Sequence, residues 1–487
     1  MTVALVARDG TRLPHELAPR ERIEQLCDPG SVRFFRSAAA GRGRRSEPGD
    51  GVLVAAGTRA GRPVFAYAQD RGFAGGSLGA THGESIVRML RMAGEAGAPV
   101  VAFVESAGAR VDDGTAALAS YGRIFREQVR LSGRCPQIAV VTGVSAGGGA
   151  YSPALADFVV MTGDARLFLT GPSIVREVMG EDVGMDDLGG PAVHARNGVC
   201  HLAAGSDGEA IELAGELIDL LDRSPQPVLQ GGRRPAAEPA AADPGAVVPA
   251  DQRKVYDVRG VIAGIVDGGW TIELAPRFAP NLVTALGRVD GRPVGVVANQ
   301  PRHIGGVLDA ASAQKAARFV RTCNSFGLPI VVLVDTPGFM PGLRQETGGV
   351  LRHGAKLLHA FAEAEVPTVT VVLRKAFGGG YIAMNSRALG ADLVLAWPGA
   401  QIGVLGAPQA VELVHRRELA AADDRAAESR RLQDEYAETH LSAAVAARDG
   451  HVDEIVRPPE TRDRIVWALQ TLGHGRTGGS QLGNIPL

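Results

Sequence analysis

The sequence predicts an α/β protein made of two copies of one domain. Apolar runs rich in β-branched residues alternate with amphipathic helix candidates along most of the chain, the pattern of a largely parallel sheet covered by helices. Three sequence blocks also recur in the same order, at an offset of 230 residues from Gly97 to Gly327 and of 231 from Gly147 to Gly378. Such ordered recurrence indicates a duplicated domain rather than chance apolar similarity.

The repeated blocks are two predicted strands and the turn after the second strand. Residues 97–108 match 327–338, and residues 136–153 match 367–381, followed by a third pair near Asp157 and Asp392. In each second block, a β-branched run leads into three glycines and then a helix-compatible segment. The pattern predicts a buried strand, a tight turn and a helix start in each domain.

The elements of the first half follow in chain order. A helix candidate at 19–27 precedes a basic, glycine-rich run at 41–45. We interpret this run as a solvated loop, with a phosphate contact as the alternative. The remaining elements are strands at 52–55, 62–69 and 100–105, a glycine-rich loop at 72–79, and helices at 84–96 and 116–132.

Composition places a boundary between the two halves. Six prolines stand among Ala, Gly and Gln between residues 225 and 250, which predicts a linker without a packed core. We therefore expect an N-terminal domain at 1–224, a linker at 225–250 and a C-terminal domain at 251–487. Within the last, residues 412–438 are rich in Arg, Glu and Ala and predict an exposed or partner-facing helical segment.

Charge and residue usage exclude several classes of function. A formal charge of −2 gives no general electrostatic reason to bind nucleic acid or an anionic membrane. The four cysteines lack the spacing of a zinc site, and the eleven histidines form no metal-binding motif, so we expect no metal. No signal peptide or membrane-length apolar run is present, which predicts a soluble, cytoplasmic protein.

The two glycine turns are the chemical signal that stands out. Glycine lets backbone N–H groups approach a ligand closely, and the first N–H groups of a helix have no partner inside the helix. Each turn is therefore a candidate oxyanion site. Two such sites suit a reaction in which two carbonyl oxygens gain negative charge, while the reactants bring their own proton acceptor and electrophile.

A serine hydrolase is an alternative interpretation of the first turn. Gly143-Val-Ser-Ala-Gly147 has the form of a nucleophile elbow, with Ser145 as nucleophile, His194 or His201 as base and an acid from 182–187. The matching position in the second turn is Ala376, so the repeat retains the glycines and not the hydroxyl.

Several carboxylates stand at predicted strand ends or turns, where either acid–base catalysis or helix capping explains them. They are Glu105, Asp112, Asp113, Asp335 and Glu346.

A series of ordered motifs covers nearly all of the chain outside the linker. They include Gly75-Gly-Ser-Leu-Gly79 with His82-Gly-Glu84, Gly108-Ala-Arg110, Ala146-Gly-Gly148 with Tyr151-Ser-Pro-Ala154, Asp335-Thr-Pro-Gly-Phe-Met-Pro-Gly342, Arg352-His-Gly-Ala-Lys356 and Ala396-Trp-Pro398. With these motifs the chain resembles the carboxyltransferase (β) subunit of biotin-dependent acyl-CoA carboxylases. The resemblance implies two crotonase-like ββα spiral domains, an acyl-CoA substrate, and a homohexamer.

The resemblance also assigns roles to residues. It implies that the N–H groups of Gly147 and Gly148 hold the thioester oxygen as it becomes an enolate, and that Gly379 and Gly380 hold the ureido oxygen of biotin. The implied substrate-binding residues are Gly75, Gly76, Ser77, Ala107, Gly108, Ala146, Tyr151 and Ile382. The implied residues on the biotin side are Phe339, Gly378 and Tyr381.

The chain has no Met-Lys-Met biotinylation motif, so the resemblance implies biotin carried by a partner, the biotin carboxylase/biotin carrier (α) subunit. A biotin-dependent decarboxylase of malonyl-type thioesters is an alternative with the same two turns. Four departures from the family pattern bear on the substrate: Ile382 where Asp is usual in propionyl-selective relatives, Ala107 for Gly, Ser85 for a Lys that could contact phosphate, and Leu343-Arg344.

Overall fold

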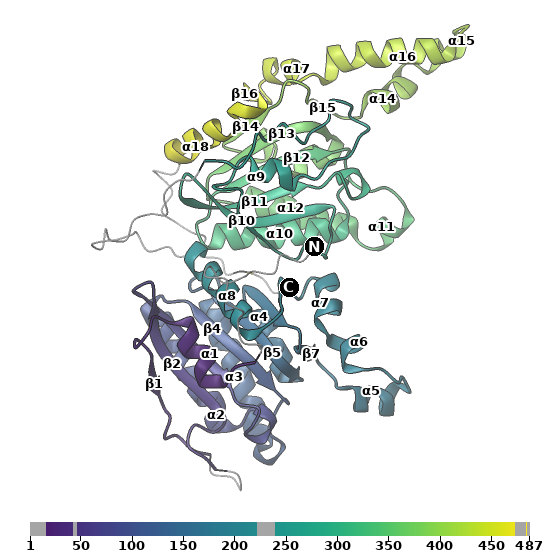
Figure 1. The fold of residues 1–487 in the computed structure, drawn as a ribbon. Helices are drawn as coiled ribbons and strands as arrows, with labels where there is room; N and C mark the ends of the chain where they lie inside the picture. Colours follow the sequence, from purple (N-terminus) through teal and green to yellow (C-terminus); the bar gives the residue numbers. More distant parts are fainter. Residues whose placement is uncertain (1–15, 42–45, 222–238, 473–483, 485–487) are drawn as a thin grey trace. The chain divides into compact units, whose positions relative to one another are not determined.

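The computed structural model describes residues 16–41, 46–221, 239–472 and 484. The chain divides into two compact units, residues 1–222 with 481–487, and residues 223–480. Each unit is built on one eight-stranded sheet (Figure 1).

The first unit has the strand order β1-β2-β3-β4-β5-β6-β8, with β7 beside β5. Strands β1 to β3 pair antiparallel, and the pairs from β3 onwards are parallel. The strands are β1 Arg33–Phe35, β2 Val52–Arg59, β3 Arg62–Gln69, β4 Val100–Ser106, β5 Gln137–Ala146, β6 Phe158–Thr162, β7 Arg166–Phe168 and β8 Leu202–Ala204.

Helices cover both faces of this sheet. Alternate residues of β2, β3 and β4 form a buried cluster with apolar residues of α2 and α3, and α1 and α8 pack together over the sheet through β2, β3, β5 and β6. The expected helix at 84–96 begins one turn earlier and ends at Gly97, which has a left-handed φ of 63°. The helices are α1 Pro19–Leu26, α2 Ala80–Ala96, α3 Thr115–Leu131, α4 Gly148–Leu155, α5 Pro172–Met179, α6 Met185–Gly189, α7 Pro191–Asn197 and α8 Asp207–Leu221.

The second unit repeats this topology. Its strand order is β16-β14-β13-β12-β11-β10-β9, with β15 beside β13, so the predicted duplication is confirmed strand by strand. The strands are β9 Thr271–Glu273, β10 Leu282–Val289, β11 Arg292–Asn299, β12 Ile330–Thr336, β13 Thr368–Phe377, β14 Leu393–Ala396, β15 Gln401–Gly403 and β16 Glu454–Ile455.

Helices α9 and α18 contribute to the main apolar core of the second unit, while α10 and α12 pack against each other. Its helices are α9 Arg259–Ala263, α10 Ala310–Ser325, α11 Leu343–Thr347, α12 Val350–Ala362, α13 Gly378–Ala383, α14 Ala407–Val414, α15 Arg416–Ala421, α16 Arg425–Tyr436, α17 Ala443–Arg448 and α18 Thr461–Leu472.

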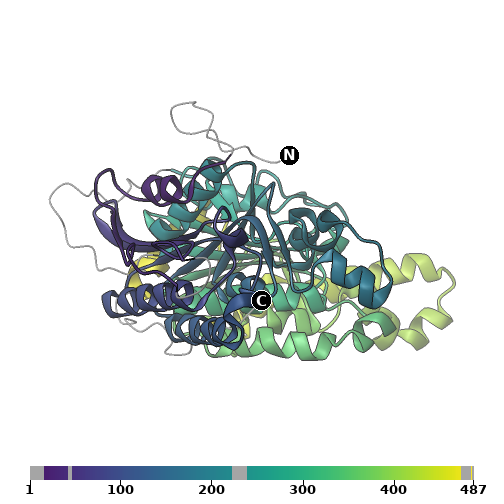
Figure 2. The same cartoon turned by 90° about the horizontal axis from the view of Figure 1, so that it is seen from below.

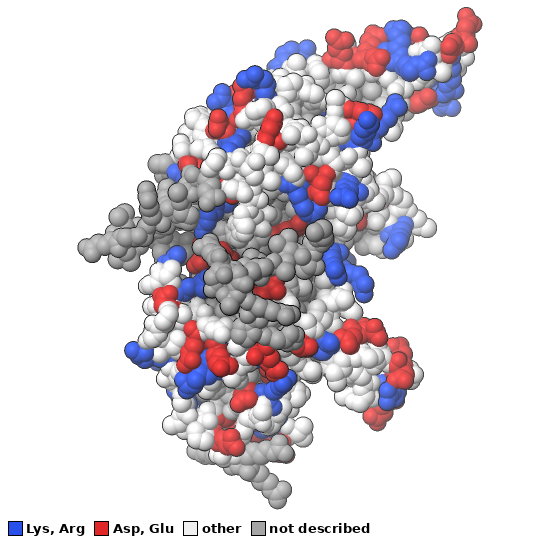
Figure 3. Space-filling view, viewed as in Figure 1, with Lys and Arg blue, Asp and Glu red and all other residues white. Residues whose placement is uncertain are grey.

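Helices α15 and α16 extend away from the sheet of the second unit, the yellow-green projection in Figures 1 and 2. Acidic and basic side chains are intermixed along them (Figure 3). Arg431 forms ion pairs with Glu418, Glu428 and Glu435. This segment is helical and exposed, as residues 412–438 predict.

The predicted linker differs from the structure in its second half. Ala240 forms a bridge with Asp267, the Ala241 N–H donates to Ala263 O at 3.3 Å, and Val248 packs against the core of the second unit. Residues 239–250 therefore belong to that unit, because alanine and valine side chains supply apolar contacts between the prolines. Residues 225–238 lie outside the described part of the chain.

The end of the chain also differs from the expected boundary. Asn484 packs on the first unit, where its carbonyl accepts from Ser132 Oγ at 3.1 Å and its amide lies 3.4 Å from Asp157. In the described residues, every helix is too short or too polar to cross a bilayer.

Candidate active site

The first glycine turn connects β5 to α4. Gly147 has φ 58° and ψ −126°, a conformation that favours glycine, and it forms the N-cap of α4. Its N–H donates to Phe168 O on β7 at 3.1 Å. Gly148 and Gly149 are the first two residues of α4, so their N–H groups have no partner within the helix.

The second glycine turn has the same form. β13 ends at Phe377, and Gly378 has a φ of 54°, close to that of its counterpart Gly147. Gly379 and Gly380 follow at the start of α13. A Cβ placed on Gly380 would lie 2.8 Å from Gly338 Cα, so only glycine fits there without moving the backbone.

The loop that contains Gly75, Gly76 and Ser77 lies against the loop after β4. Ala107 N donates to Gly75 O at 3.0 Å, and Leu78 N donates to Gly108 O at 2.9 Å. A Cβ on Gly76 would lie 2.1 Å from the carbonyl oxygen of Glu105, which explains the glycine. Of the substrate-side residues predicted here, the structure brings this group together within one pair of loops.

The Arg110 side chain holds these loops together. Its side chain is buried, pairs with Asp50 at 2.6 Å and donates to Ser77 O at 3.0 Å. Asp50 also accepts from His82 N at 2.9 Å. Burial, reinforced by the Arg110 charge, lowers the pKa of His82 to about 3, so this ring is neutral near pH 7.

The remaining predicted residues lie on the two short helices and one loop. Tyr151 on α4 and Ile382 on α13 are exposed to 50% and 48%, as residues that meet a ligand would be. Phe339 pairs with Leu308 in a short bridge after β12, and a Cβ on Gly379 would lie 3.6 Å from its ring. Burial raises the pKa of Tyr381, whose hydroxyl has no partner among the described residues.

Three of the five carboxylates expected at strand ends or turns are engaged in structural contacts: Glu105, Asp113 and Asp335. Glu105 pairs with Arg22 at 3.0 Å, and Asp335 pairs with Arg374 at 2.8 Å and accepts from the Tyr256 hydroxyl at 2.9 Å. Asp113 accepts from Ala80 N at 2.7 Å. These contacts favour the capping and support interpretation over acid–base catalysis.

The hydrolase alternative does not fit the structure. Ser145 is fully buried, and within the described residues its hydroxyl has no hydrogen-bond partner. His194 instead contacts Leu167 O at 2.6 Å, and His201 Nδ1 accepts from Val159 N at 3.0 Å. A buried hydroxyl without a base cannot act as a nucleophile.

Ser85, which was expected to replace a phosphate-contacting lysine, makes a contact inside the first unit. Ser85 is buried, and its hydroxyl accepts from Arg36 Nε at 3.0 Å. The matching residue of the second unit, Lys315, donates to three carbonyl oxygens at 2.8 to 3.0 Å. Both side chains therefore hold a segment that precedes a strand, β2 in the first unit and β10 in the second.

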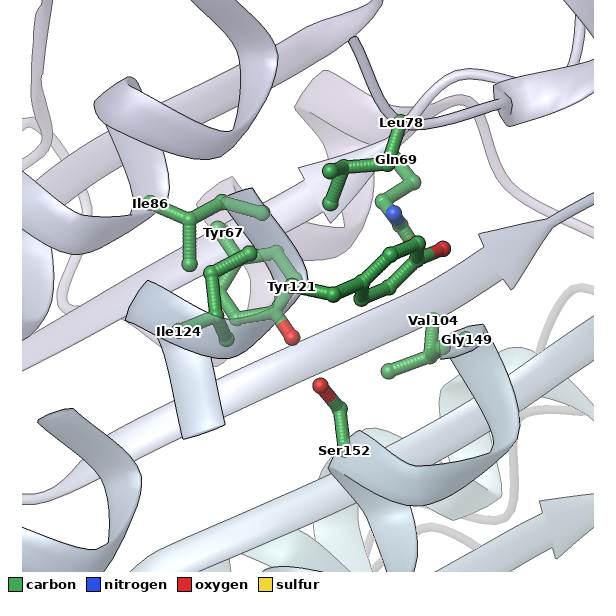
Figure 4. A pocket seen from close by; sticks show the side chains of 9 residues that line it. All are labelled: Tyr67, Gln69, Leu78, Ile86, Val104, Tyr121, Ile124, Gly149 and Ser152. Atoms are coloured by element: carbon green, nitrogen blue, oxygen red, sulfur yellow. The ribbon is translucent and has the colours of Figure 1, made fainter. Parts of the chain in front are cut away.

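A small cavity lies behind the first glycine turn (Figure 4). Its lining includes Gly149 and Ser152 of α4, Tyr121 of α3 and Tyr67 of β3. Sequence reasoning missed Tyr121 and Arg110, because a tyrosine at an apolar helix position is typical of core packing and a loop arginine is typical of solvent. A polar residue within the apolar stripe of 116–132 was the available signal for Tyr121, and the motif Gly108-Ala-Arg110 was the available signal for Arg110.

Comparison with known proteins gives a consistent result. A family model for the carboxyl transferase domain matches residues 15–479. The methylmalonyl-CoA carboxyltransferase 12S subunit of Propionibacterium freudenreichii subsp. shermanii is 44% identical, covering 93% of this chain and 87% of the relative. The propionyl-CoA carboxylase beta chain of Saccharopolyspora erythraea is 43% identical, covering 96% and 90%.

A crystal structure of transcarboxylase 12S, described as a hexamer assembly with methylmalonyl-coenzyme A and methylmalonic acid bound, superposes with a TM-score of 0.91. It is 42% identical to this chain over 97% of it and 93% of the solved chain. The protein has two repeated α/β units, each with a strand–glycine–helix turn. With the matches above, these units define it as a carboxyltransferase of crotonase-like fold. The chain belongs to the carboxyl transferase domain family, with the carboxyltransferase subunits of biotin-dependent acyl-CoA carboxylases.

Proposed function

We propose that this chain transfers a carboxyl group from carboxybiotin to the α-carbon of a short-chain acyl-CoA through a thioester enolate. The observation that supports this most strongly is the pair of glycine turns at matching positions of a duplicated fold in a carboxyltransferase chain. Such turns hold oxyanions without supplying a nucleophile.

In this proposal the first unit takes the acyl-CoA. Gly148 N–H, at the start of α4, is the main donor to the thioester oxygen, because Gly147 N–H also donates a hydrogen bond to Phe168 O. Gly75, Gly76, Ser77, Ala107 and Gly108 border the thioester, together with Ala146 and Tyr151. A fixed pair of loops suits this task, since catalysis by positioning depends on pre-arranged donors.

The second unit holds the biotin ureido group in the same way. Gly379 and Gly380 donate to the ureido oxygen, with Phe339, Gly378 and Tyr381 around it. Because Gly379 has no Cβ, the space beside the Phe339 ring stays open. A flat space of this kind suits a planar group such as the ureido ring. When bound, carboxybiotin would supply CO2 and a ureido nitrogen that accepts the α-proton. The apolar side chain of Ile382 suits a roomier or more hydrophobic acyl pocket.

Partner and location complete the proposal. Biotin arrives on a biotin carboxylase/biotin carrier subunit, and the chain acts as a cytoplasmic homohexamer, as the hexamer of the similar 12S structure suggests. The decarboxylase alternative would use the same turns. Carboxyl transfer is favoured because both relatives described above have carboxyl-transfer names.

The test is biotin-dependent decarboxylation of malonyl-, methylmalonyl- and ethylmalonyl-CoA by the isolated chain, with free biotin as acceptor. Turnover that requires biotin is expected, and the ranking of the three thioesters reports the room beside Ile382. Absence of turnover with all three, in a preparation shown to be assembled, would overturn the proposal.

A further inference from the structure

One aromatic side chain of the first unit contacts both the glycine turn before α4 and the end of β4. Tyr121 lies on α3 and is 4% exposed. A Cβ placed on Gly148 would lie 2.7 Å from its ring, so the ring is in close contact with the residue whose N–H faces the thioester in the proposal above. The ring therefore limits how far the start of α4 can move towards α3.

The hydroxyl of Tyr121 reaches the other loop. It lies 3.3 Å from Ser106 Oγ, and Ser106 Oγ accepts from Gly108 N at 3.2 Å. Burial raises the pKa of Tyr121, so the hydroxyl stays protonated at neutral pH. A chain of two hydrogen bonds thus connects α3 to the loop of Ala107 and Gly108.

The second unit has some of the same contacts at its own glycine turn. Thr336 Oγ1 accepts from Gly338 N at 3.2 Å, as Ser106 does for Gly108, and the Phe339 ring lies near Gly379 as Tyr121 lies near Gly148. An aromatic ring and a strand-end hydroxyl recur in both units. The aromatic hydroxyl is found at the first turn and has no equivalent on Phe339.

We propose that Tyr121 is a positioning residue for the acyl-CoA half of the reaction: its ring fixes Gly148, and its hydroxyl fixes Ser106 and through it Gly108. This inference rests on the proposed function of the first unit. The contacts of Tyr121 described above all lie within the first unit, so we expect its replacement to affect the thioester half of the reaction and not the biotin half.

The cavity offers a matched control. Tyr67 lines the same cavity, and in Figure 4 its hydroxyl points towards Ser152 and away from the Tyr121 hydroxyl. Tyr67→Phe and Tyr121→Phe each remove one buried hydroxyl from one cavity. They differ in that the Tyr121 hydroxyl contacts Ser106.

The experiment measures kcat, KM for the malonyl-type thioester, KM for free biotin and the thermal midpoint for wild type, Tyr121→Phe and Tyr67→Phe. Loss of one positioning hydrogen bond lowers kcat/KM for the thioester about fivefold in Tyr121→Phe. We expect KM for biotin to stay unchanged, and thermal midpoints to match in the two variants. Equal kinetics of the two variants would overturn the inference.

A second arm uses Ser106. Ser106→Ala and the double variant with Tyr121→Phe are expected to show the same loss, because both break one connected pair of bonds. Ser106→Thr, which has the hydroxyl found at Thr336, is expected to restore the rate. Losses that multiply in the double variant would contradict the coupling. A wild-type chain without turnover would instead overturn the proposed function itself.

Discussion

At the scale of single residues, Gly148 is a position where an added methyl group is expected to disturb the first glycine turn. A Cβ there meets the Tyr121 ring at 2.7 Å, so alanine requires either the start of α4 or this ring to move. Loss of one oxyanion donor costs about a hundredfold in kcat. Gly148→Ala is therefore expected to lower biotin-dependent decarboxylation by about that factor.

Gly122→Ala is the matched control for this change. Gly122 lies on α3, and a Cβ there meets nothing within 4 Å. Alanine in a helix interior stabilises by about 1 kcal/mol relative to glycine, so activity is expected to be unchanged and the thermal midpoint slightly raised. Equal activities of the two alanine variants would contradict the role of Gly148.

His82 makes stability depend on pH. Its folded-state pKa is about 3, below its ordinary value of 6.5, so between these values the unfolded chain binds a proton that the folded chain does not. The stabilisation is complete above pH 6.5 and is lost as pH falls, by about 1.4 kcal/mol per unit. Urea unfolding at pH 7 and pH 5 is expected to show a fall of about 2 kcal/mol that is absent in His82→Gln.

At the scale of elements, α1 is held to the sheet by a buried charge. Arg22 is 2% exposed and pairs with Glu105 at 3.0 Å and with Asp207 at 2.8 Å, which joins α1, β4 and the start of α8. Removing one member of a buried ionic group leaves the others uncompensated, at a cost of about 3 to 5 kcal/mol. Arg22→Met is expected to lower the free energy of unfolding by this amount.

Arg20→Met, on the same helix, provides the comparison. Arg20 is largely exposed, pairs with Glu24 at 3.4 Å and lies over the Phe34 ring. Exposed pairs contribute about 0 to 1 kcal/mol. If chemical denaturation showed the same loss in the free energy of unfolding for both variants, the ion pairs of Arg22 would not be what holds α1 to the sheet.

The sequence predicted the elements that repeat and missed the contacts that do not. Strands β4 and β12, and the turns at Gly147 and Gly378, were predictable because two copies show the same β-branched runs and glycines. The packing of 239–250 was not, since it depends on individual alanine and valine contacts between prolines. The pairing of Arg22 with Asp207 joins residues far apart in sequence, which no local pattern encodes.

The candidate site was predictable to a similar degree. The loops of Gly75 to Ser77 and Ala107 to Gly108 were placed together by the family resemblance, and the structure shows their hydrogen bonds. The burial of Ser85 was not predictable, because burial is a tertiary property. Comparison with Lys315 in the other repeat would have revealed a loop support.

At the scale of the whole molecule, assembly is the property to measure. Large apolar side chains are exposed on α5, where Val178 is 72% exposed, and on α14, where Leu413 is 71% exposed. Exposed apolar side chains of this size are candidates for contacts between copies of the chain. Light scattering after size exclusion is expected to give about 300 kDa, six copies of the 50.6 kDa chain. A mass of one chain at micromolar concentration would contradict the hexamer.

The duplication also means that the two glycine turns are supported by different side chains. The first glycine turn rests on Tyr121 from a helix, and the second lies against Phe339 from a loop, so the two supports share no side chain. A mutation that retunes one support leaves the other copy of the fold untouched. The residues that support the first turn can therefore vary in sequence independently of the residues that support the second turn.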